Sequence, residues 1–432
     1  KTMRDRRIHE SGKYMFSVGV YLLISLLLVT CSTQSSGDLS QQELVQARSK
    51  VLLISFDGFR ADYLSSEHTP FLQELSKNGA RSEGLIPVFP SKTFPNHYAI
   101  AVGLYPENNG IIGNSMVDTV MGKSYSLGDR EQVENPNWYE GEPIWNTAEK
   151  QGVRAGTMFW VGSEAPIQDM RPTHWKSYDG TLPDSARIDM VLAWLGSDSS
   201  SEVDFATVYF SFLDSQGHRY GTDAPQTIKA LQRVDTLMSY LMQQLASKGL
   251  DQETNIVLVS DHGMHNVSRE RVVRLDSFID IDRVRWISGS PSVTLNIDPS
   301  YRMQAYQELR KAQENGAPFN VYMKQDIPER FRYKNHDRTP DLLLLANLGY
   351  TITTTDRLDS RPNFPSGGAH GYDPTHPEMH AVFMAIGPDI VPGSVLPPFE
   401  VVHVYELLTH LLGIAPAPND GNLETFEGIL YD

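Results

Sequence analysis

Four continuous apolar runs along the chain are typical of strands that are buried on both faces. They are Val51–Phe56, Phe205–Leu213, Asn255–Ser260 and Ala381–Ile386. A strand covered by helices on both sides has no solvent face, so its sequence is apolar throughout instead of alternating. These runs predict the central strands of one sheet.

Segments with helical periodicity lie between these runs. In Ala224–Lys248, apolar residues recur every three or four positions from Ile228 to Leu245, and Gly249 marks the predicted end of the helix. Strands that alternate with helices predict an α/β fold with a mostly parallel central sheet and helices on both faces.

The stretch from about 271 to 355 breaks this alternation. It contains a predicted strand (Ser292–Ile297), a predicted helix (Tyr301–Gln313) and a Pro- and charge-rich segment around Ile327–Pro340. We expect it to be a smaller cap region inserted into a single domain that spans 48–432.

The first thirty residues have the pattern of a secretory signal. A basic head precedes the apolar run Tyr14–Val29, which is shorter than the roughly 20 residues of a membrane-spanning helix. Cys31 follows Thr30, as the lipid-bearing cysteine follows the signal of bacterial lipoproteins. We expect a lipoprotein-type signal peptide at 1–30, lipidation of Cys31 and a polar tether at 31–47. Ordinary secretion and an uncleaved anchor are the alternatives.

A lipoprotein-type signal would make this protein a periplasmic or cell-envelope lipoprotein that is held at a membrane by its lipid. Ser32 follows the cysteine, where an Asp is associated with retention in the inner membrane, so the sequence weakly favours the outer membrane. The sequence predicts no particular oligomeric state.

Charge and cysteine content narrow the possible functions. The formal net charge is −16 and no basic stripe is present, which argues against a module that binds nucleic acid stably. A small anionic substrate remains compatible with this charge if bound cations reverse the local field. With one cysteine, no intramolecular disulfide can form, so packing and metal must stabilise the fold.

Acidic residues follow three of the predicted strands. Asp57, Asp214 and Asp261 each come at or just after the end of an apolar run. Open α/β sheets bind ligands outside the carboxyl ends of their strands, so we expect these carboxylates to share one rim. Clustered carboxylates repel one another and usually require cations.

Histidines accompany these carboxylates. His218 lies four residues after Asp214, His262 adjoins Asp261, and His370 lies in a glycine-rich loop. Mixed Asp and His ligation suits zinc. Each of these residues alone would more often be structural, and it is the combination on one rim that predicts a metal centre.

Thr93 is the candidate nucleophile. Pro95 suits the first turn of a helix that runs through Ala99–Leu104, which places Thr93 at the helix N-terminus. Free N–H groups and the helix dipole favour an anion such as a phosphoryl group there. The alternative is that Thr93 only caps the helix.

The segment FPSKTFPNHYAIAVGLYPENNGIIGN (89–114) resembles the nucleophile motif of the nucleotide pyrophosphatase/phosphodiesterase family, within the alkaline phosphatase superfamily. Four shorter blocks, around Asp57, Asp214, Asp261 and His370, are similar to the family's other motifs and occur in the same order. The resemblance covers about 50–415. Because cysteine-rich modules like those of animal members are lacking, we expect a compact bacterial form.

The resemblance implies two zinc ions per chain and a set of site residues. One ion would be held by Asp57, Asp261, His262 and Thr93, and the other by Asp214, His218 and His370. Asn114 matches a residue that donates to a phosphoryl oxygen. Phe94 and Tyr178 match positions that stack a nucleobase, and Tyr209 is a further candidate for the substrate pocket.

The implied activity is hydrolysis of nucleotides or related phosphodiesters to nucleoside 5′-monophosphates, through a covalent threonine intermediate. The same machinery could instead act on lipid or choline phosphodiesters or on phosphomonoesters, and a non-enzymatic binding lipoprotein is a third possibility. The segment Tyr372–Pro377 departs from the family pattern, which leaves substrate preference open.

Overall fold

The computed structural model describes residues 49–196 and 201–431, and residues 47–432 form one compact unit. The predicted signal peptide, the Cys31 lipidation site and most of the tether lie outside the described residues and stay predictions. Among the described helices, none combines the length and the apolar character that crossing a membrane requires.

The core of this unit is an eight-stranded sheet. Its five strands from β9 to β7 run parallel, whereas β18 runs antiparallel to both of its neighbours. The order across the sheet is β19 (Ser394–Leu396), β2 (Ala80–Ser82), β18 (Phe383–Ile386), β9 (Thr254–Val259), β1 (Lys50–Phe56), β8 (Phe205–Phe210), β6 (Ala155–Met158) and β7 (His174–Lys176). The prediction of a mostly parallel α/β sheet is confirmed.

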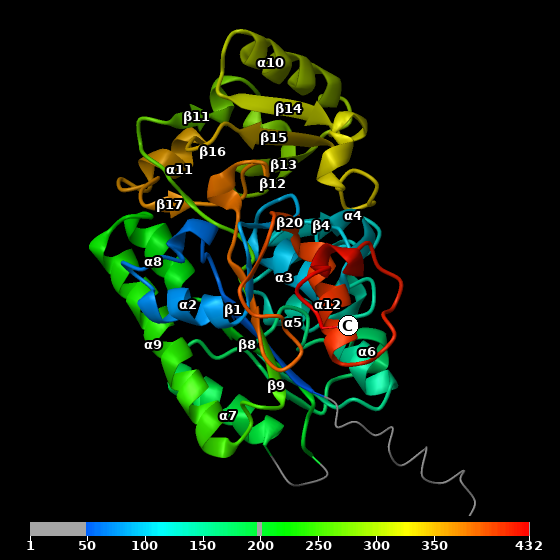
Figure 1. Ribbon diagram of the computed structural model, residues 1–432. Helices are drawn as coiled ribbons and strands as arrows, with labels where there is room; N and C mark the ends of the chain where they lie inside the picture. The colour runs from blue at the N-terminus through cyan, green and yellow to red at the C-terminus, as the bar shows by residue number, and fades with distance from the viewer. Residues whose placement is uncertain (1–48, 197–200, 432) are drawn as a thin grey trace, which may run out of the picture. The chain divides into compact units, whose positions relative to one another are not determined.

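Helices cover both faces of the sheet (Figure 1). One face packs against α2 (Pro70–Leu75), α7 (Asp184–Leu195) and α9 (Pro225–Lys248), and the other against α3 (Thr93–Val102), α6 (Ile144–Lys150) and α12 (Val404–Leu411). Alternate residues of β1 divide between the two cores, with Val51 and Leu53 in one and Leu52 and Ile54 in the other. Both faces of the strand are therefore buried, which explains why its sequence is apolar throughout.

The helix predicted at Ala224–Lys248 is confirmed as α9, and Gly249 ends it with a φ of 71°.

The strand predicted at Phe205–Leu213 is confirmed, but its predicted end was wrong. The strand β8 stops at Phe210, and the helix α8 (Phe212–Tyr220) follows, so Asp214 lies in the first turn of a helix. Phe210 is aligned with Phe56, the last residue of β1. Beyond that point the chain has no strand partner, and a helix satisfies its peptide groups instead.

The predicted cap region contains a second sheet with its own core (Figure 1). Its strands are antiparallel, in the order β12 (Val284–Ile287), β13 (Ser292–Ile297), β15 (Leu342–Ala346) and β14 (Phe319–Met323). The helix α10 (Arg302–Glu314) packs against β14. The strand β13 and helix α10 match the predicted elements closely, whereas β12, β14 and β15 were not predicted.

Short strand pairs and short α-helices accompany these two sheets. Four two-stranded pairs are β3 (Leu85–Ile86) with β20 (Phe399–Glu400), β4 (Ser115–Asp118) with β5 (Lys123–Ser126), β10 (His265–Asn266) with β17 (Gly368–Ala369), and β11 (Val272–Arg274) with β16 (Thr351–Thr353). The remaining α-helices are α4 (Pro106–Asn109), α5 (Arg130–Val133) and α11 (Thr355–Asp359).

Two cationic side chains, one partly buried and one buried, connect the cap to the loop before α3 and to the β4–β5 pair. The Lys92 ammonium, directly before Thr93, donates to the carbonyls of Gly289 and Ser292 at 2.8 and 3.3 Å. Burial lowers the pKa of Lys92 to about 8. Arg338, which is 7% exposed, donates to Asp118 of β4 at 2.8 Å. These bonds fix the cap against the segment that carries the candidate nucleophile.

Candidate active site

The three aspartates meet at the carboxyl ends of the central strands. Asp57 follows β1 directly, Asp261 comes two residues after β9, and Asp214 lies in the first turn of α8. Asp57 and Asp261 are buried, with exposures of 2% and 0%. The rim predicted from the sequence thus brings these side chains together, although Asp214 reaches it from a helix and not from a strand end.

A first group of ligand atoms surrounds the Nε2 atom of His262. This atom lies 3.0 Å from Asp261 Oδ2, 3.5 Å from Asp57 Oδ1 and 3.3 Å from Thr93 Oγ1. These are the four residues predicted for one metal ion. Three different segments of the chain deliver them to one point.

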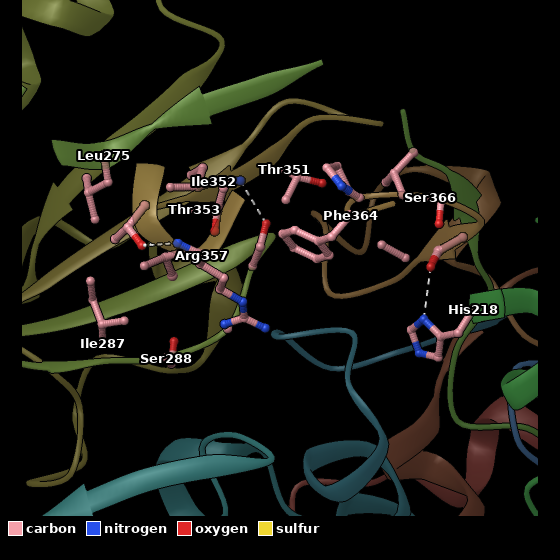
Figure 2. A pocket seen from close by; sticks show the side chains of 18 residues that line it. His218, Leu275, Ile287, Ser288, Thr351, Ile352, Thr353, Arg357, Phe364 and Ser366 are labelled. Atoms are coloured by element: carbon pink, nitrogen blue, oxygen red, sulfur yellow. Dashed lines mark hydrogen bonds between the residues drawn. The ribbon is translucent and has the colours of Figure 1, made fainter. Parts of the chain in front are cut away.

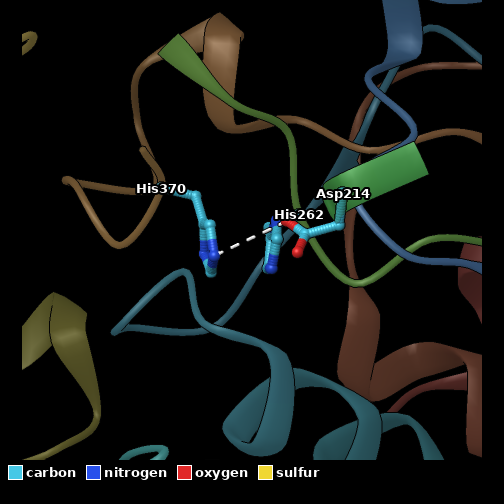
Figure 3. Close-up of side chains that lie close together, drawn as sticks. All are labelled: Asp214, His262 and His370. Carbon is cyan, nitrogen blue, oxygen red and sulfur yellow. Dashed lines mark ion pairs between the residues drawn. The ribbon is translucent and has the colours of Figure 1, made fainter. Parts of the chain in front are cut away.

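A second group surrounds the Oδ1 atom of Asp214. It lies 3.4 Å from His218 Nε2 and 3.8 Å from His370 Nε2, and these two nitrogens are 3.0 Å apart. Figure 3 shows His370 and His262 beside Asp214, and the two imidazole rings stack with centroids 3.5 Å apart. The two groups are therefore neighbours within one site.

Backbone carbonyls fix the tautomer of all three predicted histidine ligands. The Nδ1 atoms of His218, His262 and His370 lie 2.9, 2.9 and 2.8 Å from the carbonyl oxygens of Gly368, Gly263 and Ser91. A carbonyl only accepts, so each Nδ1 carries a proton, and in the neutral ring each Nε2 presents a lone pair to the site. Lone pairs of His218 and His370 that face each other repel unless a cation lies between them.

The carboxylates show the same requirement for a cation. Asp57 Oδ1, Asp214 Oδ1 and Asp261 Oδ2 are buried and have no hydrogen-bond partner in the described part of the protein. The second oxygen of Asp57 accepts from Tyr209, and that of Asp261 accepts from the Gly58 amide. Buried anionic oxygens without a partner are costly, and metal coordination satisfies them.

The pKa values in this cluster reflect the crowded charges. Burial, reinforced by the carboxylates of Asp261 and Asp214, raises the pKa of Asp57 well above its usual range. Burial also raises the pKa of Asp214. For Asp261, burial acts in the same direction, but His262 and His97 outweigh it and hold the pKa well below its usual range. Burial lowers the pKa of His370, which keeps this ring neutral, as a ligand must be.

His97 is a neighbour of this cluster that the sequence did not single out. It lies with Asp57 and Asp261 in a group of three potential ligands, and its Nδ1 is 3.4 Å from Asp261 Oδ2. However, Nδ1 is also 3.0 Å from the Thr93 carbonyl, and Nε2 is 2.8 Å from the Ser55 hydroxyl. Both ring nitrogens have partners, so His262, and not His97, completes the first group. The four-residue spacing from Thr93 on one helix could have indicated this supporting position.

Thr93 begins helix α3 but does not cap it. The N-cap is Lys92, with no side-chain capping bond, so the alternative of a simple capping threonine is not supported. The Asn96 side chain accepts from the Val88 amide at 2.7 Å and donates to the Pro90 carbonyl at 3.1 Å. These bonds shape the loop before the helix and leave the Thr93 hydroxyl facing His262.

Asn114 is oriented by the backbone beside the nucleophile. Its Oδ1 accepts from the Phe94 amide at 2.9 Å. The Nδ2 group therefore points the other way, and among the described residues it has no acceptor. This amide lies next to Thr93 and is available to donate to a phosphoryl oxygen, a contact that stays a prediction.

The aromatic candidates occupy different surroundings. Phe94 packs against Tyr125 at 5.9 Å, and Tyr178, 43% exposed, packs against Phe159 at 5.3 Å. Tyr209 donates its hydroxyl to Asp57 Oδ2 at 2.6 Å. The hydroxyl therefore supports a candidate metal ligand, while the Tyr209 ring lies 6.3 Å from the Tyr178 ring. The expected place of Tyr209 in the substrate pocket stays a prediction.

A mostly parallel sheet with Asp and His side chains at its strand ends, beside a threonine at a helix N-terminus, is the arrangement of the alkaline phosphatase superfamily. Within this class, the family model described as type I phosphodiesterase / nucleotide pyrophosphatase matches residues 51–373. The chain belongs to that family.

Individual relatives agree with this assignment. Ectonucleotide pyrophosphatase/phosphodiesterase family member 1 of Mus musculus is 38% identical over 383 residues, which are 86% of this chain but only 41% of the relative. The bis(5′-adenosyl)-triphosphatase of Homo sapiens is 35% identical over 96% of this chain and 87% of its own length. The chain thus spans less than half of the first of these relatives.

Solved structures of family member 5 have the same fold. The human protein superposes with a TM-score of 0.84 at 32% identity, covering 89% of this chain and all of that chain. An inactive threonine-to-alanine variant of the murine protein, in complex with AMP, gives a TM-score of 0.83 at 31% identity, with the same coverage.

Proposed function

We propose that this protein is a two-zinc phosphodiesterase and pyrophosphatase that hydrolyses nucleotides to nucleoside 5′-monophosphates through a covalent intermediate on Thr93. Membership of the type I phosphodiesterase / nucleotide pyrophosphatase family supports this assignment. Its main support is that three buried carboxylate oxygens, which have no hydrogen-bond partner among the described residues, lie close to three imidazole Nε2 atoms beside the Thr93 hydroxyl.

The donor set fits two zinc ions. Asp57, Asp261, His262 and Thr93 offer four ligands to one ion. Asp214, His218 and His370 offer three to the other, which leaves a position open, as catalytic zinc sites do. Bound zinc would supply positive charge that favours ionisation of a threonine hydroxyl or a water molecule and that stabilises anionic phosphoryl oxygens.

The residues of the chain provide the nucleophile and the positioning. The substrate phosphoryl group approaches the N-terminus of α3, where the helix dipole favours an anion. The Asn114 amide donates to one of its oxygens. The Thr93 oxygen forms a bond to phosphorus, and the bond to the leaving group breaks with its electron pair on the leaving oxygen. Water then attacks the phosphorus, and Thr93 departs and regains its proton.

Nucleotide substrates are favoured by two observations on relatives. One is named as a bis(5′-adenosyl)-triphosphatase, and the structure of another contains AMP. Phe94 and Tyr178 are the aromatic side chains that would hold a base, and stacking of a base on such a ring contributes about 1–3 kcal/mol.

The decisive variant is Thr93→Ala, assayed on the nitrophenyl ester of thymidine 5′-monophosphate. Loss of one charge-stabilising group lowers kcat by about 10²–10³, and loss of the nucleophile should lower it further, to an undetectable rate. Thr181→Ala, which removes an exposed hydroxyl bonded to Asp179, is the matched control and should keep full activity.

Two further measurements complete this experiment. Elemental analysis should find about two zinc ions per chain in both variants, so that loss of activity is separated from loss of metal. The wild type should turn over the thymidine ester faster than nitrophenyl phosphate or glycerophosphocholine. Near-normal activity of Thr93→Ala would overturn the mechanism, and preference for either alternative substrate would overturn the nucleotide assignment.

A further inference from the structure

The candidate site is bordered by different structures on two of its sides. Towards the cap, His218 lies at one end of a cavity of about 350 Å³ (Figure 2). On another side, Tyr209 links the site to Tyr178, because its hydroxyl donates to Asp57 while its ring centroid lies 6.3 Å from that of Tyr178. Tyr178 does not line the cavity, so the tyrosine side of the site is separate from it.

Tyr178 lies in an irregular segment (residues 177–183, called the Tyr178 segment below). This segment joins the end of β7 at Lys176 to the start of α7 at Asp184. The Tyr178 side chain is 43% exposed, so part of its ring is free to meet a ligand. An exposed side chain on a connecting segment can adopt several orientations unless its neighbours restrict it. The residues that hold this segment therefore decide whether the ring is ready to stack on a base.

Arg187 of α7 holds the Tyr178 segment from inside the protein. This residue is 3% exposed, and its guanidinium donates to the carbonyls of Leu182 and Asp179 at 3.1 and 3.5 Å. A further bond of 3.0 Å goes to the carbonyl of Tyr209 in β8. A planar guanidinium with several donors in fixed directions suits this arrangement, and it keeps its charge at neutral pH. One side chain thus joins the segment to the strand that carries Tyr209.

Phe159 packs against both Arg187 and Tyr178. The guanidinium carbon of Arg187 lies 5.1 Å from the centre of the Phe159 ring, and the rings of Phe159 and Tyr178 meet edge to face at 5.3 Å. Phe159 has a φ of 68°, in the left-handed region that a bulky residue rarely adopts. Backbone strain of this kind persists where the surrounding structure enforces it, and it is concentrated at functional sites. Phe159 therefore carries the position of Arg187 to the Tyr178 ring.

Two further hydrogen bonds restrict Tyr178 itself. Its amide donates to the buried carboxylate of Glu164 at 3.2 Å, and its hydroxyl lies 3.0 Å from the Ser211 hydroxyl. Both the backbone and the tip of the ring are therefore held in place. Ordering a binding segment in advance removes an entropic cost that the ligand would otherwise have to offset.

We propose that Arg187 is a positioning residue for nucleotide binding, which holds the Tyr178 segment so that the exposed ring is oriented for a base before the substrate arrives. Arg187 is buried and acts through Tyr178, not by touching the substrate. It therefore sets the preference for phosphodiesters that carry a base over those that do not. The proposal rests on the proposed function, from which it takes the stacking of a base on Tyr178.

The test compares Arg187→Met with wild type on two phosphodiesters that share one leaving group. These are the nitrophenyl ester of thymidine 5′-monophosphate and methyl nitrophenyl phosphate, in which a methyl group replaces the nucleoside. The methionine keeps the packing against Phe159 but removes the donors. We expect KM for the thymidine ester to rise about 5- to 20-fold with kcat within about twofold, because stacking stabilises the ground state and the transition state alike. The kcat/KM for the methyl ester should stay within about twofold, which also shows that the protein is folded.

Tyr178→Ala shows whether the effect passes through the tyrosine ring. This variant should raise KM for the thymidine ester at least as much as Arg187→Met does. Adding Arg187→Met to Tyr178→Ala should change KM by no more than about twofold, because a residue that acts through a ring has no effect once the ring is gone. Arg187→Lys keeps the charge but has fewer donors, so its KM should lie between those of wild type and Arg187→Met.

Two controls make the result specific. Arg283→Met removes another guanidinium that lies over an aromatic ring, that of Tyr301 in the cap at 4.3 Å, and it should leave both esters unchanged. Thr181→Ala removes a hydrogen bond within the Tyr178 segment, from the hydroxyl to Asp179, but none of the bonds to Arg187. It should also leave KM for the thymidine ester unchanged.

The possible outcomes separate this inference from the function on which it rests. If wild type cleaves neither ester, or if Tyr178→Ala leaves KM for the thymidine ester unchanged, the proposed use of a nucleotide fails and this inference fails with it. If Tyr178→Ala selectively weakens the thymidine ester but Arg187→Met affects both esters equally or neither, the function stands and the positioning role is refuted. Additive effects of the two substitutions would refute it as well. If Arg187→Met does not fold, the same comparison of esters with Arg187→Lys decides.

Discussion

The two oxygens of each buried aspartate in the site have different partners. In Asp57, Oδ2 accepts a hydrogen bond from Tyr209 and Oδ1 faces His262. In Asp261, Oδ1 accepts from the Gly58 amide and Oδ2 faces His262. One oxygen thus fixes the orientation of the carboxylate while the other stays available for a cation. Outer partners of this kind orient ligands and tune metal affinity.

Tyr209→Phe tests this division of roles. The variant removes the hydroxyl that orients Asp57 but keeps the ring, which packs edge-on against His97. We expect zinc affinity, measured by competition with a chelator, to fall about 10- to 100-fold, while activity recovers in excess zinc. Tyr178→Phe is the control, because its hydroxyl contacts Ser211 and no carboxylate. Unchanged affinity in Tyr209→Phe would show that Asp57 does not depend on this bond.

At the scale of elements, the sequence pattern was most informative where a segment is buried on a regular face. The run Val51–Phe56 and the helix Ala224–Lys248 could be located because their periodicity follows from the faces they bury. The transition after Phe210 could not, because the end of β8 depends on where its partner β1 ends. Likewise, the strands β12 and β14 are held by pairing within the cap, which local sequence does not reveal.

The prediction of the candidate site from the sequence is limited in the same way, because contacts between distant parts of the chain cannot be seen in it. Motif residues such as Asp57 and His370 were found because their chemistry and their order along the chain resemble those of a family. The supporting role of Tyr209 was missed, because it depends on a contact with Asp57, 152 positions away in the chain. Chain spacing carries no information about such contacts.

The link between the cap and the β4–β5 hairpin depends on Arg338. Its guanidinium donates to Asp118 and to the carbonyls of Gly110, Trp138 and Asn137, at 2.6–2.9 Å. Arg338→Met would leave a nearly buried carboxylate and these carbonyls without their donor. Breaking a buried pair in this way costs about 3–5 kcal/mol, which denaturant unfolding should detect.

The matched control is Arg285→Met, which breaks the exposed pair with Asp298, at 3.2 Å. Exposed pairs contribute about 0–1 kcal/mol, so the free energy of unfolding should hardly change. A loss in Arg338→Met no larger than in this control would contradict the assigned structural role.

At the scale of the whole molecule, the metal site should contribute to stability. Ligands that bind only the folded state stabilise it, by about 2.7 kcal/mol at a concentration 100 times Kd. Zinc should also offset the burial and the neighbouring negative charges that together raise the pKa of Asp57. We expect chelation to lower the unfolding midpoint by roughly 5 °C or more, and added zinc to restore it, in thermal scans at constant pH.

A pair of carboxylate variants gives this experiment its control. Asp298→Asn, remote from the site, should retain the full response to chelator and zinc, whereas Asp57→Asn should lose most of it. If wild-type protein has the same midpoint with and without chelator, the buried carboxylates are not stabilised by a bound cation.

The partly buried Lys92 has a consequence for substrate binding. Lys92 directly precedes the candidate nucleophile, and its ammonium donates to the Gly289 and Ser292 carbonyls of the cap. These hydrogen bonds hold the cap against the segment that carries Thr93. A cap that opened and closed in each catalytic cycle would have to break these bonds every time. We therefore expect the cap to be in its final position before the substrate binds, so that no binding energy is used to close it.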